Sequence, residues 1–145
     1  IRVFNYFSNT QDLSERFLIT DILRAIRDKT VLKTSSDYLV RDFLHPSDFY
    51  KLVRALLSAP AANAAIDCYS RAPIDKPNLL AVMQEKFGLH YEITEASAVV
   101  NATGGKPHYY SLNTRAADFG YRPGLTSLEG LLLESEKLLG LQLAR

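Results

Sequence analysis

The chain has 145 residues, of which 47% are hydrophobic and 23% charged, enough for one globular domain with a sizeable core. It has 17 Lys and Arg residues and 16 Asp and Glu residues. The resulting net charge of +1 excludes a generic nucleic-acid or membrane-surface binder. Its lone cysteine, Cys68, excludes an internal disulfide and a multi-cysteine metal site, and no apolar run is long enough for a membrane span. We therefore expect a cytoplasmic protein with neither nucleic-acid nor membrane partners.

Helical and extended patterns alternate along the first half of the chain, which favours a mixed α/β (α+β) fold. Apolar spacing and capping residues define the helices, and apolar runs define the strands. The expected elements are a strand at 1–7, a helix at 15–27 with Ser14 as its N-cap, extended pieces at 31–33 and 38–40, and a helix capped by Ser47 and ended by Pro60.

The second half continues the alternation. Residues 95–107 are expected to be irregular, because Gly104 and Gly105 mark a turn. The other expected elements are a strand at 65–69, a helix at 76–87 capped by Asp75, strands at 89–94 and 108–112, a short helix between Asn113 and Gly120, and a last helix from Ser127 that a Thr126–Glu129 capping box opens.

The sequence lacks several patterns that enzymes need. Its first glycine is Gly88, and the later glycines match neither the dinucleotide nor the P-loop spacing. No tyrosine has a lysine four residues on, and no nucleophile elbow is present. The three histidines, His45, His90 and His108, are scattered. We therefore expect no catalytic, cofactor-binding or metal-binding residue within this chain.

A few polar and aromatic residues remain as ligand-binding candidates. Arg41 could present its guanidinium fork to phosphate oxygens, or it could pair with Asp42 or with a helix C-terminus. Asn5 could offer its amide to a ligand or simply form a turn. Tyr109 could stack on a base or sugar or belong to the core, and His45 fits a structural place at a helix entry.

Five segments, taken in order, resemble the NAD(P)-dependent epimerase/dehydratase family, the extended short-chain dehydrogenases that act on nucleotide sugars. Each motif is weak alone, but together they span almost the whole chain. Residues 2–7 resemble the family's R-x-x-N-x-x-G strand, 41–48 its R-D-F/Y-I-H-V-x-D segment, 66–70 its y-N-v-G-s strand, 113–123 its D-x-S-K-A-x-x-x-L-G-W/Y-x-P segment and 126–131 its s-l-e-e-G-l helix.

The resemblance implies that residues 1–145 form a single substrate-binding domain, the C-terminal lobe of a larger two-domain enzyme whose dinucleotide-binding domain is mostly absent here. The abrupt start at Ile1 agrees with a fragment. The lobe would position a nucleotide-diphosphate sugar for hydride transfer to NAD or NADP, which the absent half would mainly bind, and alone it would be inactive. The full-length form could assemble as a homodimer.

Carried over residue by residue, the resemblance implies three substrate contacts. Asn5 would lie near the diphosphate or the sugar, Arg41 would bind the diphosphate, and Lys106 would be a secondary phosphate or ribose contact. The resemblance does not distinguish epimerase from dehydratase or reductase chemistry.

Three positions depart from the family pattern. Ser8 replaces a glycine that follows the first strand, Asp67 replaces the asparagine of the y-N-v-G-s strand, and Tyr69 replaces its glycine. The Ser8 exchange puts the loop conformation in question, because glycine reaches backbone angles that serine avoids. These departures keep an alternative open, in which the chain is a non-enzymatic interaction or scaffold domain derived from the same family.

Overall fold

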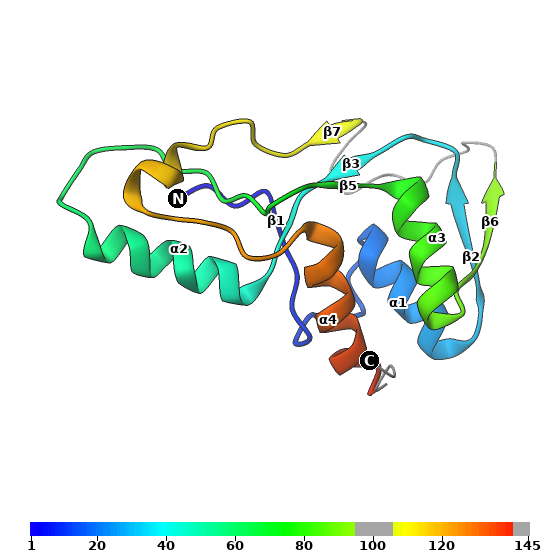
Figure 1. The fold of residues 1–145 in the computed structure, drawn as a ribbon. Coiled ribbons are helices and arrows are strands. Elements are labelled where there is room, and N and C mark those ends of the chain that lie inside the picture. Colours follow the sequence, from blue (N-terminus) through cyan, green and yellow to red (C-terminus); the bar gives the residue numbers. More distant parts are fainter. Residues whose placement is uncertain (95–105, 141–145) are drawn as a thin grey trace.

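The computed structural model describes residues 1–94 and 106–140 and confirms the mixed α/β fold (Figure 1). The elements are β1 (Asn5–Tyr6), α1 (Leu18–Asp28), β2 (Val31–Ser35), β3 (Val40–Arg41), β4 (Phe43–Leu44), α2 (Pro46–Ser58), β5 (Ile74–Asp75), α3 (Lys76–Phe87), β6 (His90–Thr94), β7 (His108–Tyr109), a 3-10 helix η1 (Arg115–Phe119) and α4 (Ser127–Leu139).

The strands pair in small sheets whose parallel pairs come from segments far apart in the chain. β1 runs parallel to β4, with Asn5 opposite Phe43, and β2 runs parallel to β6. β3 lies between the antiparallel β5 and the parallel β7. Because only Asp42 separates β3 from β4, this pairing brings Asn5, at the start of β1, close to Arg41, at the end of β3.

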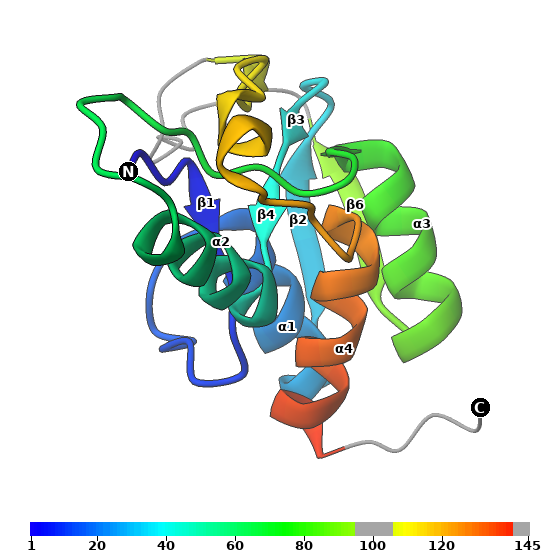
Figure 2. The ribbon, with the colours of Figure 1, turned by 60° about the vertical axis from the view of Figure 1, so that its left-hand side comes forward.

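The core has two parts that meet at β4. Successive side chains of a strand point to opposite faces, so Phe43 packs with the larger cluster and Leu44 with the smaller one. The larger cluster joins α1, α3 and α4 around β2, and the smaller one lies between α2 and η1. Figures 1 and 2 show α2 with η1 at one end of the molecule and α1, α3 and α4 grouped at the other.

Two helices begin at residues other than those expected. In α1, the hydroxyl of Thr20 accepts a hydrogen bond from Phe17 N at 3.0 Å, so the helix starts at Leu18 and Ser14 is not its cap. In α2, Nδ1 of His45 accepts from Ser47 N at 3.1 Å, so His45 is the cap. The predicted N-cap of α1 was wrong. The residue at that position is Phe17, whose side chain cannot accept a hydrogen bond, and its N–H is bonded instead by Thr20 inside the helix.

The expected starts of the last two α-helices are confirmed. The carboxylate of Asp75 accepts from Asn78 N at 2.9 Å at the start of α3. At the start of α4, the hydroxyl of Thr126 accepts from Glu129 N at 3.2 Å, and the Glu129 carboxylate accepts from Thr126 N at 2.7 Å. The short helix before Gly120 is confirmed as the 3-10 helix η1.

Several expected strands are shorter in the structure. The strand at 1–7 reduces to β1 and one isolated bridge between Arg2 and Asp67, and that bridge is all that remains of the strand at 65–69. The strand at 108–112 ends at Tyr109. Beside the Arg2–Asp67 bridge, the carboxylate of Asp67 adds side-chain bonds to Arg2 and to the Ser111 hydroxyl. Residues 95–105 of the expected irregular stretch lie outside the described residues.

Polar side chains fix the connections between these elements. Asp48 of α2 is buried, and its carboxylate accepts from Gly124 N at 3.0 and 2.9 Å and from Leu125 N at 3.0 Å. Burial alone would raise the pKa of this carboxyl group, but these bonds and one from Lys51 outweigh it and hold the pKa of Asp48 below its ordinary value. The charged form of Asp48 therefore ties α2 to the turn before α4.

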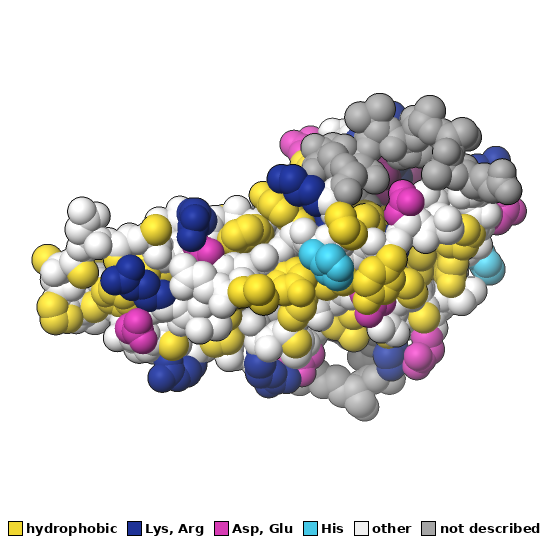
Figure 3. All heavy atoms as spheres, turned by 90° about the horizontal axis from the view of Figure 1, so that it is seen from above, with side chains coloured by type: hydrophobic (Ala, Val, Ile, Leu, Met, Phe, Trp, Pro, Cys, Tyr) yellow, Lys and Arg dark blue, Asp and Glu magenta, His cyan; other side chains and the backbone are white. Residues whose placement is uncertain are grey.

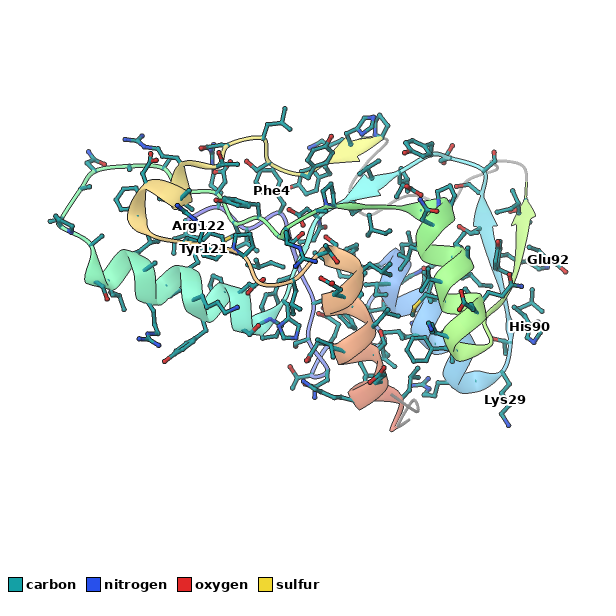
Figure 4. All side chains as sticks on the ribbon, in the orientation of Figure 1. Phe4, Lys29, His90, Glu92, Tyr121 and Arg122 are labelled. Carbon is teal, nitrogen blue, oxygen red and sulfur yellow. The ribbon has the colours of Figure 1, made fainter. Side chains whose placement is uncertain are left out.

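Within the described residues, every helix is too short or too polar to cross a bilayer, and no group of His, Cys, Asp or Glu side chains could hold a metal ion. Hydrophobic side chains form a band across the face seen from above (Figure 3). At the outer edge beside β2 and β6, the side chains of Lys29, His90 and Glu92 are directed away from the rest of the molecule (Figure 4).

Candidate functional site

A cavity of about 360 Å³ opens between β1, the start of α1, β2 and β3. Asn5 and Arg41 both line it, so the structure brings together two of the three residues that we singled out as substrate contacts. They meet because β1 pairs with β4, the strand that follows Arg41 after one residue.

Arg41 is buried at this cavity, with 7% of its surface exposed. Its Nη1 donates to the carbonyl oxygens of Val40 at 2.9 Å and Pro107 at 3.3 Å, and its Nη2 donates to that of Lys106 at 2.9 Å. Burial lowers the pKa of the guanidinium, but arginine begins so high that it stays charged. The bonds hold the fork in one orientation beside the cavity.

Asp42, the neighbour that could have paired with Arg41, is engaged elsewhere. Its carboxylate accepts from Ser70 N at 3.0 Å and from the Ser127 hydroxyl at 2.8 Å, and the same hydroxyl accepts from Phe43 N at 2.9 Å. Asp42 therefore connects α4 to β4. Its carboxylate bonds to Ser70 and Ser127 instead of to Arg41.

The amide of Asn5 bridges β1 and the turn between β3 and β4. Its Nδ2 donates to the carbonyl oxygen of Asp42 at 3.2 Å. This bond fixes the side chain against the neighbouring strand while the residue still lines the cavity. Asn5 is therefore a strand residue rather than a turn residue, and its place in the cavity wall keeps the ligand-binding role a prediction.

Lys106 reaches the site mainly through its backbone. The residue is exposed and is not among those that line the cavity. Its ammonium nitrogen lies 5.0 Å from the ring centre of Tyr109, which does line the cavity. Tyr109 in turn packs edge-on against Phe4, with ring centres 5.2 Å apart, on the upper part of the molecule (Figure 4).

The charged side chains in the wall of the cavity are mostly basic. Arg16, Lys33, Arg41 and Lys76 line it against a single acidic side chain, Asp21. Asp21 itself forms an ion pair with Arg24. The positive end of the α1 dipole also faces this region, since the first turn of α1 lines the cavity. Such a lining complements an anionic ligand.

Sequence reasoning missed the contribution of Lys76. Lys76 is 4% exposed and follows the N-cap of α3, a place where lysine is usually solvated. No pattern in the sequence signals its burial, because that burial arises from the pairing of β5 with β3.

His45 is structural, as expected. Its Nδ1 faces Ser47 and its Nε2 lies 3.1 Å from the carboxylate of Glu134 on α4. That carboxylate also accepts from Asn9 N at 2.7 Å and from the Lys137 ammonium at 2.6 Å. Burial would raise the pKa of Glu134, but these bonds outweigh it and hold the pKa below its ordinary value.

The three departures from the family pattern fit their surroundings. Glycines are the only described residues with positive φ apart from Lys29, so Ser8 adopts a backbone conformation that serine tolerates. The carboxylate of Asp67 accepts from the Ser111 hydroxyl at 2.6 Å and forms an ion pair with Arg2.

At the third departure, the carbonyl oxygen of Tyr69 accepts from the Tyr121 hydroxyl at 2.7 Å, and the two rings pack edge-on at 5.2 Å. Figure 4 places Tyr121 beside Arg122 at the α2 end of the molecule, away from the cavity-lining elements β2 and β3. Burial raises the pKa of the Tyr121 hydroxyl far above its ordinary value, so it remains a donor.

Comparisons with known proteins show the same fold. No family model and no curated protein matches the sequence. The structure is similar to UDP-glucuronic acid 4-epimerase from Bacillus cereus in complex with UDP-glucuronic acid and NAD, with a TM-score of 0.75, 14% identity and coverage of 96% of this chain and 44% of that one.

Two further solved structures are similar to the same extent. dTDP-glucose 4,6-dehydratase from Bacillus anthracis, in complex with NAD, has a TM-score of 0.73, 15% identity and coverage of 93% of this chain and 42% of its own. RMD from Pseudomonas aeruginosa, complexed with NADPH, has a TM-score of 0.72, 20% identity and coverage of 95% and 46%. At these identities the similarity shows the fold, which is part of the extended short-chain dehydrogenase fold, and this chain spans less than half the length of those proteins.

Proposed function

We propose that this chain binds a nucleotide-diphosphate sugar and positions it for an NAD(P)-dependent epimerase or dehydratase reaction. The observation that carries the proposal is the shared cavity, in which Asn5 and the buried guanidinium of Arg41 form part of one wall whose charged side chains are mostly basic. The carbonyl bonds hold the Arg41 guanidinium in a fixed position at the cavity, and a fixed positive charge attracts diphosphate oxygens. The similar proteins named above include one solved with UDP-glucuronic acid and NAD, which supports the same ligand class.

The cofactor needs residues that these 145 do not include. A dinucleotide needs a glycine-rich turn at a helix N-terminus, and the first glycine of this sequence is Gly88. The residues present therefore do not fit NAD or NADP, and the chemistry at the sugar would depend on a cofactor site outside them. The contribution of this chain is binding and orientation, which lowers the barrier of a reaction held in the right geometry.

The direct test is ligand binding to the full-length protein. Calorimetry with UDP-, GDP- and dTDP-sugars should find at least one ligand, and Arg41→Ala should weaken its binding by about tenfold or more. Arg41→Lys keeps the charge but loses the fork, so it should also bind less tightly. Arg54→Ala is the matched control, because Arg54 is an exposed arginine of α2 that contacts the ring of Tyr50.

Two results would overturn the proposal. One is a folded protein, checked by thermal unfolding, that binds no sugar nucleotide at millimolar concentration. The other is unchanged affinity in both Arg41 variants.

A non-enzymatic binding module is the second candidate. The absence of a glycine-rich turn and of a Tyr-x-x-x-Lys pair from these residues, together with the exchanges at Ser8, Asp67 and Tyr69, favours it. The two candidate functions differ in whether the full-length protein converts the bound sugar nucleotide into a product. A full-length protein that binds a sugar nucleotide but yields no new sugar in product analysis, with NAD or NADP supplied, would support the module.

A further inference from the structure

Lys76 places a buried ammonium group in the wall of the same cavity. Only 4% of the residue is exposed, and its Nζ donates to the carbonyl oxygen of Ser35 at 2.6 Å and to its hydroxyl at 3.2 Å. Among the described residues, no carboxylate lies within ion-pair distance of this nitrogen. Burial lowers the pKa of Lys76, and this is offset only in part by Asp37, whose carboxylate accepts from the Ser35 hydroxyl at 3.0 Å.

The sheet register places Lys76 beside Arg41. In the antiparallel pair of β3 and β5, Arg41 lies opposite Ile74, and Lys76 comes two residues after Ile74. Residues in this diagonal relation share a face of the sheet, with Cα atoms about 7–8 Å apart. Lys76 N also donates to the carbonyl oxygen of Leu39 at 2.8 Å, which continues the pairing past the end of β5. Both side chains accordingly line one cavity.

We propose that Lys76 is a second anion-binding residue of this cavity, and that Lys76 contacts the terminal phosphate of a nucleoside diphosphate while Arg41 contacts the phosphate next to the nucleoside. An ammonium has three N–H groups, and Ser35 accepts from two of them, so the third can donate to a phosphate oxygen. The proposal deepens the proposed function and rests on it, because the ligand class is the same. It adds a residue that no sequence motif indicates, and it gives a reason for the burial of a charge that has no carboxylate within ion-pair distance among the described residues.

The test compares UDP with UMP as ligands of the full-length protein. The second phosphate is the only difference between the two probes, so their affinity ratio measures the contacts to that group. Lys76→Gln removes the charge and keeps a donor for the Ser35 carbonyl, and Lys76→Met serves in the same test if the glutamine variant does not fold. Lys86→Met is the matched control, since Lys86 is an exposed lysine in the last turn of the same helix.

We expect the unmodified protein to prefer UDP over UMP, and the Lys76 variants to lose about tenfold or more of that preference while they bind UMP almost as before. The Lys86 control should keep the preference within about threefold. A structural role alone would weaken UMP and UDP equally, and that result overturns the inference, as does an unchanged UDP preference. If UDP does not bind the unmodified protein at all, the proposed function fails as well. If only Arg41 variants lose UDP, this inference alone fails.

Discussion

The guanidinium of Arg41 donates to the carbonyl oxygen of Lys106 at 2.9 Å, so two of the three expected substrate contacts touch each other. The contact uses the backbone of Lys106 and the side chain of Arg41. It holds the residue that leads into β7 against β3, the strand that carries the arginine. The arginine therefore orients its own fork while it ties two strands together.

Because the Arg41 contact uses backbone atoms, truncation of the Lys106 side chain should change little. Lys106→Ala removes only the exposed contact between its ammonium and the Tyr109 ring, so the free energy of unfolding should fall by less than about 1 kcal/mol. Sugar-nucleotide affinity should change by less than about threefold. Urea unfolding and calorimetry measure the two quantities, and a tenfold loss of affinity would instead assign the ammonium a direct ligand contact.

The local rules in the sequence predicted the helices better than the strands. Asp75 and Thr126 cap their helices as expected, because a cap needs only neighbouring residues. The expected strand at 1–7 shrank to β1, since its length depends on the partner residues that a distant segment offers. The predicted helix starts were wrong where the N-cap is an unusual residue, as with Phe17 of α1 and His45 of α2.

Some residues of the candidate site could be predicted from the sequence, and one could not. Arg41 and Asn5 carry motif and residue-type signals, and the pairing of β1 with β4 brings them to one cavity. Lys76 has no such signal, because its burial depends on the packing of β5 beside β3. Side-chain type can be read from the sequence, whereas the desolvation of a charge requires the tertiary structure.

Asp48 should be one of the most important polar residues for stability. Asp48→Ala would leave the N–H groups of Gly124 and Leu125 without their acceptor, so the free energy of unfolding should fall by about 3 kcal/mol. Lys51→Ala is the control: it removes the other partner of the same carboxylate but at an exposed site, and it should cost less than about 1 kcal/mol. Chemical denaturation of both variants checks this, and equal losses would contradict the ranking.

The carboxylate of Glu134 should make stability depend on acid. Its pKa in the folded protein is below the ordinary value of 4.5, so the folded state binds its proton less readily than the unfolded chain. Its contribution is therefore fully present above pH 4.5 and is lost as the pH falls through the lower, folded pKa. The difference in unfolding free energy between the unmodified protein and Glu134→Gln should shrink as the pH is lowered from 6 to about 3. A difference that grows toward low pH would show the opposite sign.

Gly130 lies where α4 crosses the start of α2. An alanine is normally favoured over glycine inside a helix by about 1 kcal/mol. Here a Cβ would lie 3.1 Å from Cβ of His45, and that histidine is held by Ser47 and Glu134, so it cannot move aside without loss. We expect Gly130→Ala to lower the free energy of unfolding by about 1–2 kcal/mol despite the better propensity.

Ser135→Ala is the matched alanine substitution in the same helix. The hydroxyl of Ser135 is buried without a hydrogen-bond partner among the described residues, so its removal should raise stability by about 1 kcal/mol. Thermal and urea unfolding of the two variants should thus move in opposite directions from the unmodified protein. A stabilising Gly130→Ala would mean that the His45 side chain yields at little cost.

Cys68 should be chemically inert in the folded protein. The residue is 3% exposed, and burial raises the pKa of its thiol to about 11, so the reactive thiolate is scarce at neutral pH. At pH 8, we expect a disulfide reagent such as DTNB to leave the folded protein unlabelled over an hour and to label it within minutes in 6 M guanidinium chloride. Cys68→Ala is the blank, because it removes the chain's only cysteine. Native labelling at a rate near that of the denatured chain would show that the segment around Cys68 opens readily, and that the packing between α2 and η1 is weaker than its burial implies.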